Sequence, residues 1–151
     1  MEKELWGSAI WYFFHGIAEK INPEKFTDQK NNLFKILEIV CSNLPCPDCS
    51  EHALKEIRKI NINNITSQEI YKELLLEFHN RVNTRIKHPL FTREQLDEKY
   101  KTINLKAVMY NFNIAYKTTF YNEKLLQNNL RKKLQNGDLY EKINEVLSNC
   151  K

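Results

Sequence analysis

Apolar residues recur every three or four positions along most of this 151-residue chain, and this spacing restricts the fold more than any other feature of the sequence. The pattern is seldom interrupted, because only three Gly and four Pro occur. Long tracts of Leu, Ile, Glu, Lys and Asn favour helices over a many-turned β architecture. The sequence therefore predicts an all-α domain, long enough to bury most of the surface that it exposes when unfolded.

Capping and turn signals divide this pattern into separate helices. Thr27 and Thr92 are candidate N-terminal caps, Thr66-Ser67-Gln68-Glu69 gives a third capping signal, and Pro89 stops the helix that follows it. A short helix is expected after Thr92, and the last two helices are divided at 136–138. The other expected helices cover residues 3–21, 27–43, 46–57, 67–87, 100–120, 125–134 and 139–147.

Charge and hydropathy argue against several classes of protein. The net charge of +4 comes from 23 basic and 19 acidic residues that are intermixed along the chain, without a basic run or a glycine-rich phosphate loop. Nucleic-acid binding is therefore disfavoured. No stretch approaches the roughly 20 apolar residues of a membrane span, and residues 1–4 are too polar to begin a secretory signal. We expect a soluble protein that stays where it is made.

The four cysteines are too few for a disulfide scaffold at this length. They are Cys41, Cys46, Cys49 and Cys150. Without a secretory signal the expected compartment is reducing, where a close cysteine pair is more often catalytic or metal-binding than structural.

Cys46 and Cys49 form a Cys-x-x-Cys where one apolar helix stops and the next begins. Pro45 disfavours helix in the residue before it, and Pro47 lacks the N–H that a first helical turn leaves unpaired, so a helix can start at about Cys46. The free amides of a first turn favour a thiolate, which suits disulfide exchange. His52, three residues after Cys49, is expected beside that second thiol. The same spacing also fits half of a zinc site, or two buried thiols without a function.

Two polar pairs lie on otherwise apolar helix faces. Trp11 and His15 are four residues apart, and so are His79 and Asn83, so each pair shares one side of its helix. Buried polar side chains need partners, so His79 and Asn83 on one stripe suggest a polar object held between the helices. The alternatives are that Trp11 and His15 fill a core or an interface, and that His79 and Asn83 face solvent or bond to each other.

Three short motifs occur in order on successive expected helices: Trp11-x3-His15, Cys46-Pro-Asp-Cys49-x2-His52 and His79-Asn80-x-Val82-Asn83. Taken together they resemble the Erv/ALR family of FAD-linked sulfhydryl oxidases, best its compact members encoded by large cytoplasmic DNA viruses. The segments Leu5-Trp6-Gly7, Leu44-Pro45 and 87–91 are similar to that family as well. The resemblance covers residues 5–91. It implies a four-helix bundle that binds FAD, with a short fifth helix, usually as a homodimer.

The resemblance also implies a role for individual residues. Cys46 would be the outer sulfur that exchanges with substrate, and Cys49 the inner sulfur that meets the flavin. Lys87 and His88 both stay candidates for one contact, because the lysine of the family aligns with His88. The residues implied to bind FAD are Gly7, Trp11, His15, Cys49, His52, His79, Asn80, Val82, Asn83, Lys87, His88 and Phe91.

The chain also departs from that family. Many relatives carry a structural disulfide at the places occupied here by Leu76 and Arg93, so we expect packing to stabilise this corner. The second cysteine pair that often ferries electrons to the outer sulfur is absent. Cys150 could be a lone relay, half of a bridge with Cys41 or with another subunit, or a free thiol.

The expected organisation is an FAD-binding oxidase domain over residues 1–98 and a helical C-terminal extension over 99–151. The implied reaction oxidises protein dithiols, of a thioredoxin-like or virion protein, and passes the electrons through FAD to molecular oxygen, which gives hydrogen peroxide. The implied location is the host cytoplasm or the virion. The competing hypotheses are a zinc-stabilised helical adaptor that uses Cys46, Cys49 and histidines, a flavin-free thiol–disulfide exchange protein, and a purely structural helical protein.

Overall fold

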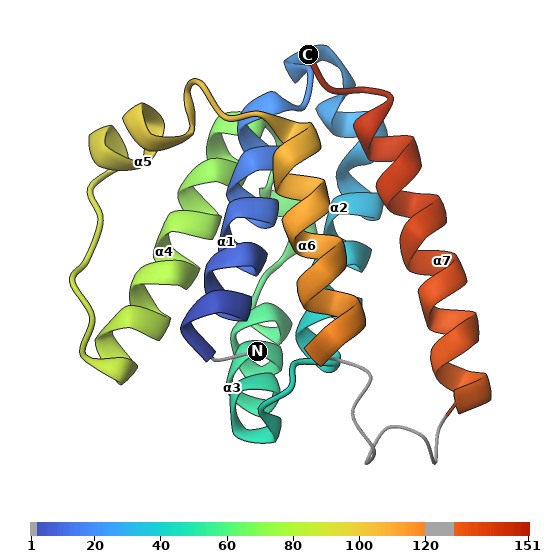
Figure 1. The fold of residues 1–151 in the computed structure, drawn as a ribbon. Helices are drawn as coiled ribbons and strands as arrows, with labels where there is room; N and C mark the ends of the chain where they lie inside the picture. Colours follow the sequence, from blue (N-terminus) through green and yellow to red (C-terminus); the bar gives the residue numbers. More distant parts are fainter. Residues whose placement is uncertain (1–2, 120–128) are drawn as a thin grey trace.

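A computed structural model describes residues 3–119 and 129–151 of the chain, and it is all-α, as predicted (Figure 1). The α-helices in these residues are α1 (Lys3–Lys20), α2 (Phe26–Ser42), α3 (Pro47–Arg58), α4 (Gln68–Ile86), α5 (Arg93–Tyr100), α6 (Leu105–Thr119) and α7 (Asn129–Leu147). Two 3₁₀ turns, Pro23–Lys25 and Ile62–Asn64, join α1 to α2 and α3 to α4. Apart from an isolated bridge between Ile21 and Cys150, the described part of the chain has no extended pairing.

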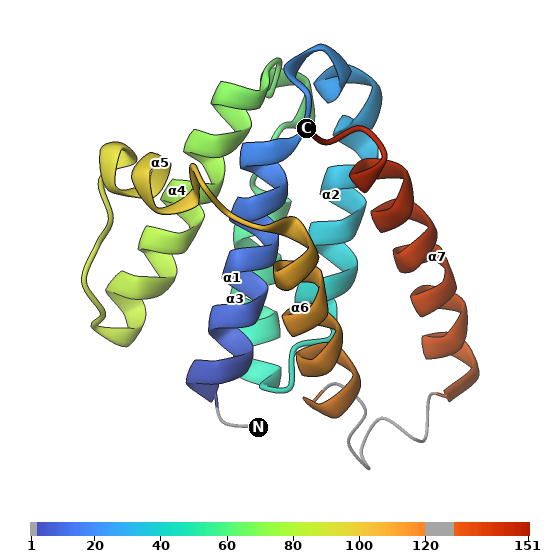
Figure 2. The same ribbon diagram turned by 45° about the horizontal axis from the view of Figure 1, so that its top comes forward.

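Helix α1 lies at the centre of the fold, between α4 and α6 (Figures 1 and 2). Helix α2 packs against α3 on one side and α7 on the other. The core between them contains fully buried side chains from several helices, among them Phe13, Phe26, Leu37 and Leu75. Burying each such side chain contributes about 1.5 to 3 kcal/mol to the stability of the fold. The packing of the helices therefore follows from the apolar stripes in the sequence.

Two of the three predicted N-terminal caps are confirmed. Ser67 accepts a hydrogen bond from the backbone N–H of Ile70, and Thr92 forms a reciprocal capping box with Gln95. The predicted cap at Thr27 is wrong, because α2 already begins at Phe26 without a side-chain cap. The preceding 3₁₀ turn, which Asn22 caps, leads the chain directly into α2.

Two expected helix boundaries in the C-terminal third are also wrong. The helix expected from residue 100 starts instead at Leu105, because Asn104 Oδ1 accepts the backbone N–H groups of Lys106 and Ala107. The expected break at 136–138 lies inside α7, which continues through Gly137. One glycine in a helix costs only about 1 kcal/mol, less than the packing of α7 supplies. Residues 125–128 of the expected helix 125–134 lie outside the described residues.

The C-terminal helices cover the core helices rather than standing apart from them. Helix α6 packs on α1, where Phe13 and Phe112 stack with ring centroids 4.0 Å apart. Gly16 of α1 faces Ile103 and Leu105, and a Cβ there would lie 3.4 and 3.5 Å from their side chains, at ordinary van der Waals distances. The C-terminus returns to the end of α1, where the Lys151 N–H donates to the carbonyl of Lys20 at 2.7 Å (Figure 2).

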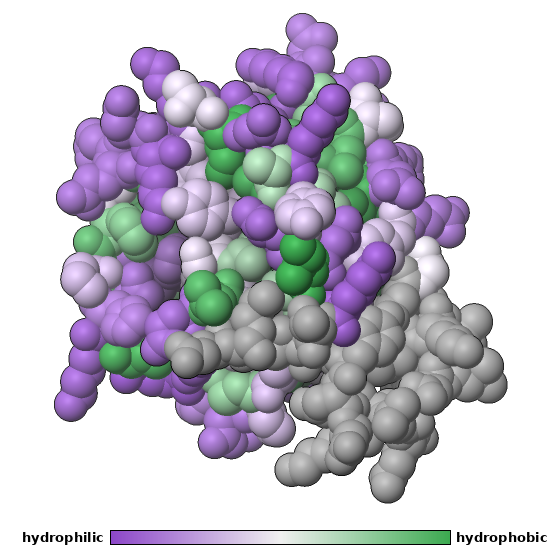
Figure 3. Space-filling model, in the orientation of Figure 1, coloured by the Kyte–Doolittle hydropathy of each residue, from purple (hydrophilic) through white to green (hydrophobic). Residues whose placement is uncertain are grey.

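The surface over α4, α1 and α6 is mainly hydrophilic, with small separate hydrophobic areas (Figure 3). Within residues 3–119 and 129–151, no helix combines the length and the apolar character that crossing a bilayer requires.

Candidate active site

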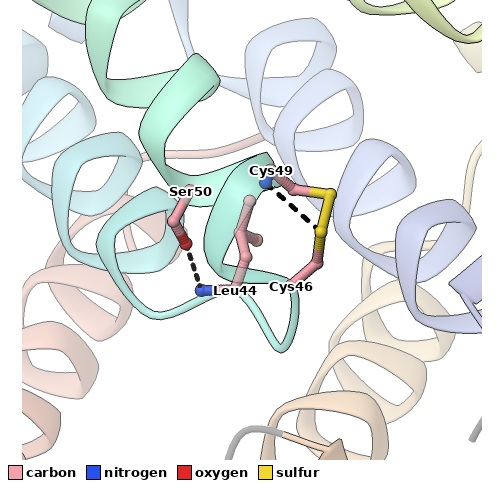
Figure 4. Close-up of a disulfide and its surroundings, with 4 residues drawn as sticks. All are labelled: Leu44, Cys46, Cys49 and Ser50. Carbon is pink, nitrogen blue, oxygen red and sulfur yellow. Dashed lines mark hydrogen bonds between the residues drawn. A yellow bond between two sulfur atoms is a disulfide. The ribbon is translucent and has the colours of Figure 1, made fainter.

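The two cysteines of the Cys-x-x-Cys lie at the start of α3 and are joined as a disulfide (Figure 4). Their Cα atoms are 5.2 Å apart, within the usual range for a disulfide. Cys46 is the N-cap residue, and its sulfur accepts the backbone N–H of Cys49 at 3.2 Å. Pro47 occupies the first turn, as predicted. The zinc hypothesis needs both sulfurs as thiolate ligands, so the disulfide argues against it.

A second pair of hydrogen bonds fixes the loop that leads into the disulfide. The Leu44 N–H donates to Ser50 Oγ at 3.0 Å (Figure 4). The Ser50 N–H donates to the carbonyl of Cys46 at 3.0 Å. Ser50 is buried and Cys46 is half-buried. The cysteine pair is therefore held in one position at a helix end, with both cysteines half-buried.

Next to the disulfide, a cavity of about 620 Å³ lies between α1, α3, α4 and α5. This volume is typical of a ligand site. Cys49 lies in the wall of the cavity and Cys46 does not. The sequence-predicted residues in the wall are Gly7, Trp11, Cys49, His79, Val82, Asn83, His88 and Phe91.

Two buried histidines from different helices form a hydrogen-bonded pair beside this cavity. His15 Nε2 on α1 and His79 Nδ1 on α4 are 2.9 Å apart. Trp11 stacks flat on His79, with ring centroids 3.8 Å apart and an angle of 8° between the planes. Burial holds the pKa of His15 well below its usual value, and burial together with the charge of Lys99 lowers the pKa of His79 to about 4. Both rings are therefore neutral at pH 7, and one donates its N–H to the other.

The amides that follow His79 hold the loop between α4 and α5. Asn80 Nδ2 donates to the carbonyl of Phe91, and Asn80 Oδ1 accepts the N–H of Phe91, both at 2.9 Å. Asn83 Nδ2 donates to the carbonyl of Pro89 at 3.0 Å. The alternative that His79 and Asn83 face solvent or bond to each other is therefore wrong, because each is buried and bonded elsewhere.

Four of the residues implied to bind FAD lie outside the wall of the cavity. His15 is buried behind His79, and Asn80 is engaged with the loop. His52 is exposed on α3 and lies outside the wall, although its three-residue spacing keeps it on the same side of the helix as Cys49. Lys87 is exposed and ends α4 with a left-handed backbone, φ 62°, so that the side chain of His88 reaches the wall instead.

The sequence reading missed two residues of α5 that lie in the wall, Lys99 and Tyr100. Lys99 Nζ is 5.0 Å from the ring centroid of Tyr12, 5.2 Å from that of Phe91 and 5.7 Å from that of Tyr100, which places a cation among aromatic faces. The signal was a lysine next to a tyrosine at the end of a capped helix. These two residues lie beyond residue 91, where the resemblance to the family ends, and the expected domain boundary at residue 98 falls inside α5.

The remaining cysteines, Cys41 and Cys150, are free thiols in the structure. Cys41 also lies in the cavity wall, and burial raises its pKa to about 12. Burial raises the pKa of Cys150 to about 11. Both thiols are thus protonated and weakly nucleophilic at neutral pH.

The corner at Leu76 and Arg93 is packed, as expected. Leu76 is 7% exposed and forms a small apolar cluster with Leu96 and Tyr100. The structure adds ion pairs around Arg93 that the sequence did not reveal.

Comparisons with known proteins identify the family. The sequence model of the Erv1 / Alr family matches residues 8–101. The chain is 25% identical over 104 residues to the putative FAD-linked sulfhydryl oxidase 096R of Invertebrate iridescent virus 3, a match that covers 67% of this chain and 69% of the relative. It is 34% identical over 99 residues to the FAD-linked sulfhydryl oxidase ERV1 of Arabidopsis thaliana, with coverage of 65% and 51%. It is 32% identical over 89 residues to the probable FAD-linked sulfhydryl oxidase FPV093 of Fowlpox virus, with coverage of 59% and 86%.

No solved structure gives a significant match. The chain spans only about half of the plant relative but most of the two viral ones. The family match covers α1 to α5 almost completely, including the disulfide and the cavity beside it. The chain belongs to the Erv1 / Alr family.

Proposed function

We propose that the protein is an FAD-linked sulfhydryl oxidase, which oxidises protein dithiols through the Cys46–Cys49 disulfide and passes the electrons through FAD to molecular oxygen. One observation carries this proposal: a disulfide lies next to the cavity, with Cys49 in the cavity wall and the half-buried Cys46 outside that wall. The names of the relatives, FAD-linked sulfhydryl oxidases, support the same class of enzyme.

The residues of the cavity fit a flavin nucleotide. Trp11 and the neutral His79 offer flat rings for stacking, and Asn83 and His88 offer polar groups in a mainly apolar wall. Lys99 brings the positive charge that the diphosphate of FAD requires. We propose that these residues, together with Gly7, Val82, Phe91 and Tyr100, hold FAD. His15 and Asn80 would act through His79 and the loop that carries Phe91.

The first half of the reaction is thiol–disulfide exchange at Cys46. A substrate thiolate attacks Cys46 Sγ, the Cys46–Cys49 bond breaks, and Cys49 leaves as a thiolate that the first turn of α3 stabilises. The second substrate thiolate then attacks the substrate sulfur of the mixed disulfide and releases Cys46 as a thiolate. The substrate has become a disulfide, and the enzyme pair has gained two electrons.

The second half returns the pair to the disulfide. FAD supplies the chemistry that thiols lack, which is to accept two electrons and deliver them to oxygen. Cys49 is the sulfur placed to donate them, because it lies in the cavity wall. Over one cycle two substrate thiols and one O₂ give one disulfide and one H₂O₂.

The partner is a protein dithiol, and the viral relatives support a virion protein made in the host cytoplasm as the substrate. The homodimer implied by the resemblance is also a proposal. Helices α6 and α7 cover one side of α1 and α2. We propose that a second subunit binds on a side that these two helices do not cover. Light scattering of the purified protein measures the mass of the particle in solution, which should be twice that of one chain if the protein is a dimer.

The function is tested by oxygen uptake of the purified protein with dithiothreitol as the substrate. We expect a yellow protein that consumes oxygen, and a Cys49→Ser variant that keeps FAD but loses turnover. Cys150→Ser is the matched control and should keep the wild-type rate, because Cys150 lies outside the cavity wall. Full oxidase activity of Cys49→Ser would refute the proposal, and so would a colourless protein.

A further inference from the structure

Helix α5 is the most polar of the helices around the cavity, and it contributes Lys99 and Tyr100 to the cavity wall. It has only eight residues, of which Leu96 and Tyr100 are buried. A helix this short is not stable by itself, so tertiary contacts must hold it in place. Besides the apolar cluster of Leu96 and Tyr100 with Leu76, a network of ion pairs holds α5 in place.

Arg93, in the first turn of α5, contacts three carboxylates. Its Nη1 lies 2.8 Å from Glu73 Oε1 and its Nε lies 3.0 Å from Asp97 Oδ1, while Nη2 pairs with Glu69. Glu69 and Glu73 belong to α4, and Asp97 is one turn further along α5. The side chain of Arg93 is only 20% exposed, so its charge is largely withdrawn from water.

A second cation continues the network into α1. Lys72 Nζ on α4 lies 3.1 Å from Asp97 Oδ1 and 2.7 Å from Glu19 Oε2. Burial by itself lowers the pKa of Lys72, but its hydrogen bonds to Glu19 and Asp97 outweigh this and raise the pKa above its usual value. Burial by itself raises the pKa of Asp97, but Arg93 and Lys72 together lower it. Both shifts favour the charged forms of Lys72 and Asp97, and the network joins α1, α4 and α5.

We propose that Arg93 is a positioning residue of the FAD site: its ion pairs fasten α5 to α4 and α1 so that Lys99 and Tyr100 close one side of the cavity. This inference rests on the proposed function, since it takes the ligand of the cavity to be FAD. Asp97 is bonded to both cations and precedes Lys99 by two residues, so the network acts on the part of α5 that reaches the cavity. Tyr100 then contacts His15, with ring centroids 5.0 Å apart.

Removal of Arg93 should detach α5 more than it unfolds the core. It leaves Glu69 and Glu73 exposed to water, but it removes the link that holds α5 to α4. The core of α1, α2 and α4 keeps its apolar packing. The expected result is a folded protein whose Lys99 is no longer held near the cavity, and hence one that binds FAD more weakly.

The test is a double-mutant cycle on the dissociation constant of FAD, with full-length protein stripped of flavin and titrated with FAD. The variants are Arg93→Met, Lys99→Met and the double variant, and Arg81→Met is the matched control. Arg81 also lies next to two carboxylates, on Glu56 and Glu77, but it is not connected to α5. We expect about tenfold weaker binding for Arg93→Met and a change below about twofold for Arg81→Met.

The cycle separates positioning from a general loss of stability. If Arg93 acts by placing Lys99, the double variant should bind FAD about as weakly as the weaker single variant. Hydrogen exchange should rise over residues 93–100 and stay unchanged in α2. If Arg93→Met fails to fold, Arg93→Lys replaces it in the same cycle, because one cation there satisfies fewer carboxylates.

The inference is overturned if the Arg93 variant binds FAD within twofold of the wild type, or if the losses of Arg93 and Lys99 multiply in the double variant. Either result leaves the proposed function intact, provided that the wild type binds FAD. Failure of the wild type to bind FAD refutes the proposed function itself.

Discussion

Two walls of the same cavity are built in opposite ways. The α4 wall belongs to the apolar core: Leu75 is fully buried behind it, and Phe78 and His79 lie in the cavity wall. The α5 wall is a short polar helix that ion pairs attach from outside, and it presents a lysine. The comparison teaches that one ligand site can combine a rigid side, set by burial, with a side whose position depends on charge. Each prediction below tests one of the two walls.

The largest effect is expected for truncation of the α4 wall. Leu75→Ala removes a side chain with no exposed surface and leaves a cavity, so the free energy of unfolding should fall by about 2 to 5 kcal/mol. Urea unfolding followed by circular dichroism measures this. A loss below about 1 kcal/mol would show that α4 is no more a part of the core than α5.

The histidine pair makes the stability of the α4 wall depend on pH. The unfolded chain protonates His79 near its usual pKa of 6.5, whereas the folded protein does so only near 4. As the pH falls from about 6.5 to 4, the unfolded state binds a proton that the folded state excludes, so stability falls, by about 3 kcal/mol from His79 alone. Unfolding experiments at several pH values test this sign.

The matched variants for the pH prediction are His79→Gln and His52→Gln. His79→Gln should flatten the pH profile of stability, since it removes one of the two buried rings. His52→Gln is the control for a histidine substitution in itself and should change the free energy of unfolding at neutral pH by less than about 0.5 kcal/mol, since this ring is exposed. If the wild type and His79→Gln show the same dependence of stability on pH, His79 is not the group that causes it.

The α5 wall should respond to the loss of its cap. Thr92 Oγ1 accepts the N–H of Gln95 at 3.1 Å, and Gln95 Oε1 accepts the N–H of Thr92 at 2.9 Å. Thr92→Ala should cost about 1 kcal/mol, chiefly as faster hydrogen exchange over residues 93–100. Faster exchange throughout α4 as well would mean that the two walls open together.

The smallest effect is expected for an exposed ion pair on α4. The side chain of Arg81 is 58% exposed and lies 3.2 Å from Glu56. Arg81→Met should change the free energy of unfolding by less than about 1 kcal/mol, because water and salt screen such pairs. A larger loss would show that exposed charges on α4 matter as much as the network of α5.

The same contrast explains how much the sequence could predict. The all-α fold, the caps at Ser67 and Thr92 and the stacking of Trp11 near His15 follow from spacings within one helix, so they were predicted. The pairing of His15 with His79 joins residues 64 positions apart, and helical periodicity carries no information at that distance. Only the resemblance to a family brought these two residues into one site.

The features that the sequence left open have local physical causes. The spacing of His52 and Cys49 places them on one side of a helix, but it does not say that His52 is exposed to solvent. Lys99 was missed because α5 has little apolar periodicity and is held by charges from α4 and α1. The break predicted near Gly137 was wrong because the buried Leu139 and Ile143 outweigh the low helix propensity of one glycine.

The central claim is that electrons pass from the dithiol through Cys49 to FAD in the adjacent cavity. Anaerobic addition of dithiothreitol to the flavin-loaded protein tests it most directly, with the flavin absorption band as the signal. The wild type should bleach, and Cys49→Ser should keep its band on the same timescale. Bleaching of Cys49→Ser at the wild-type rate would contradict the account.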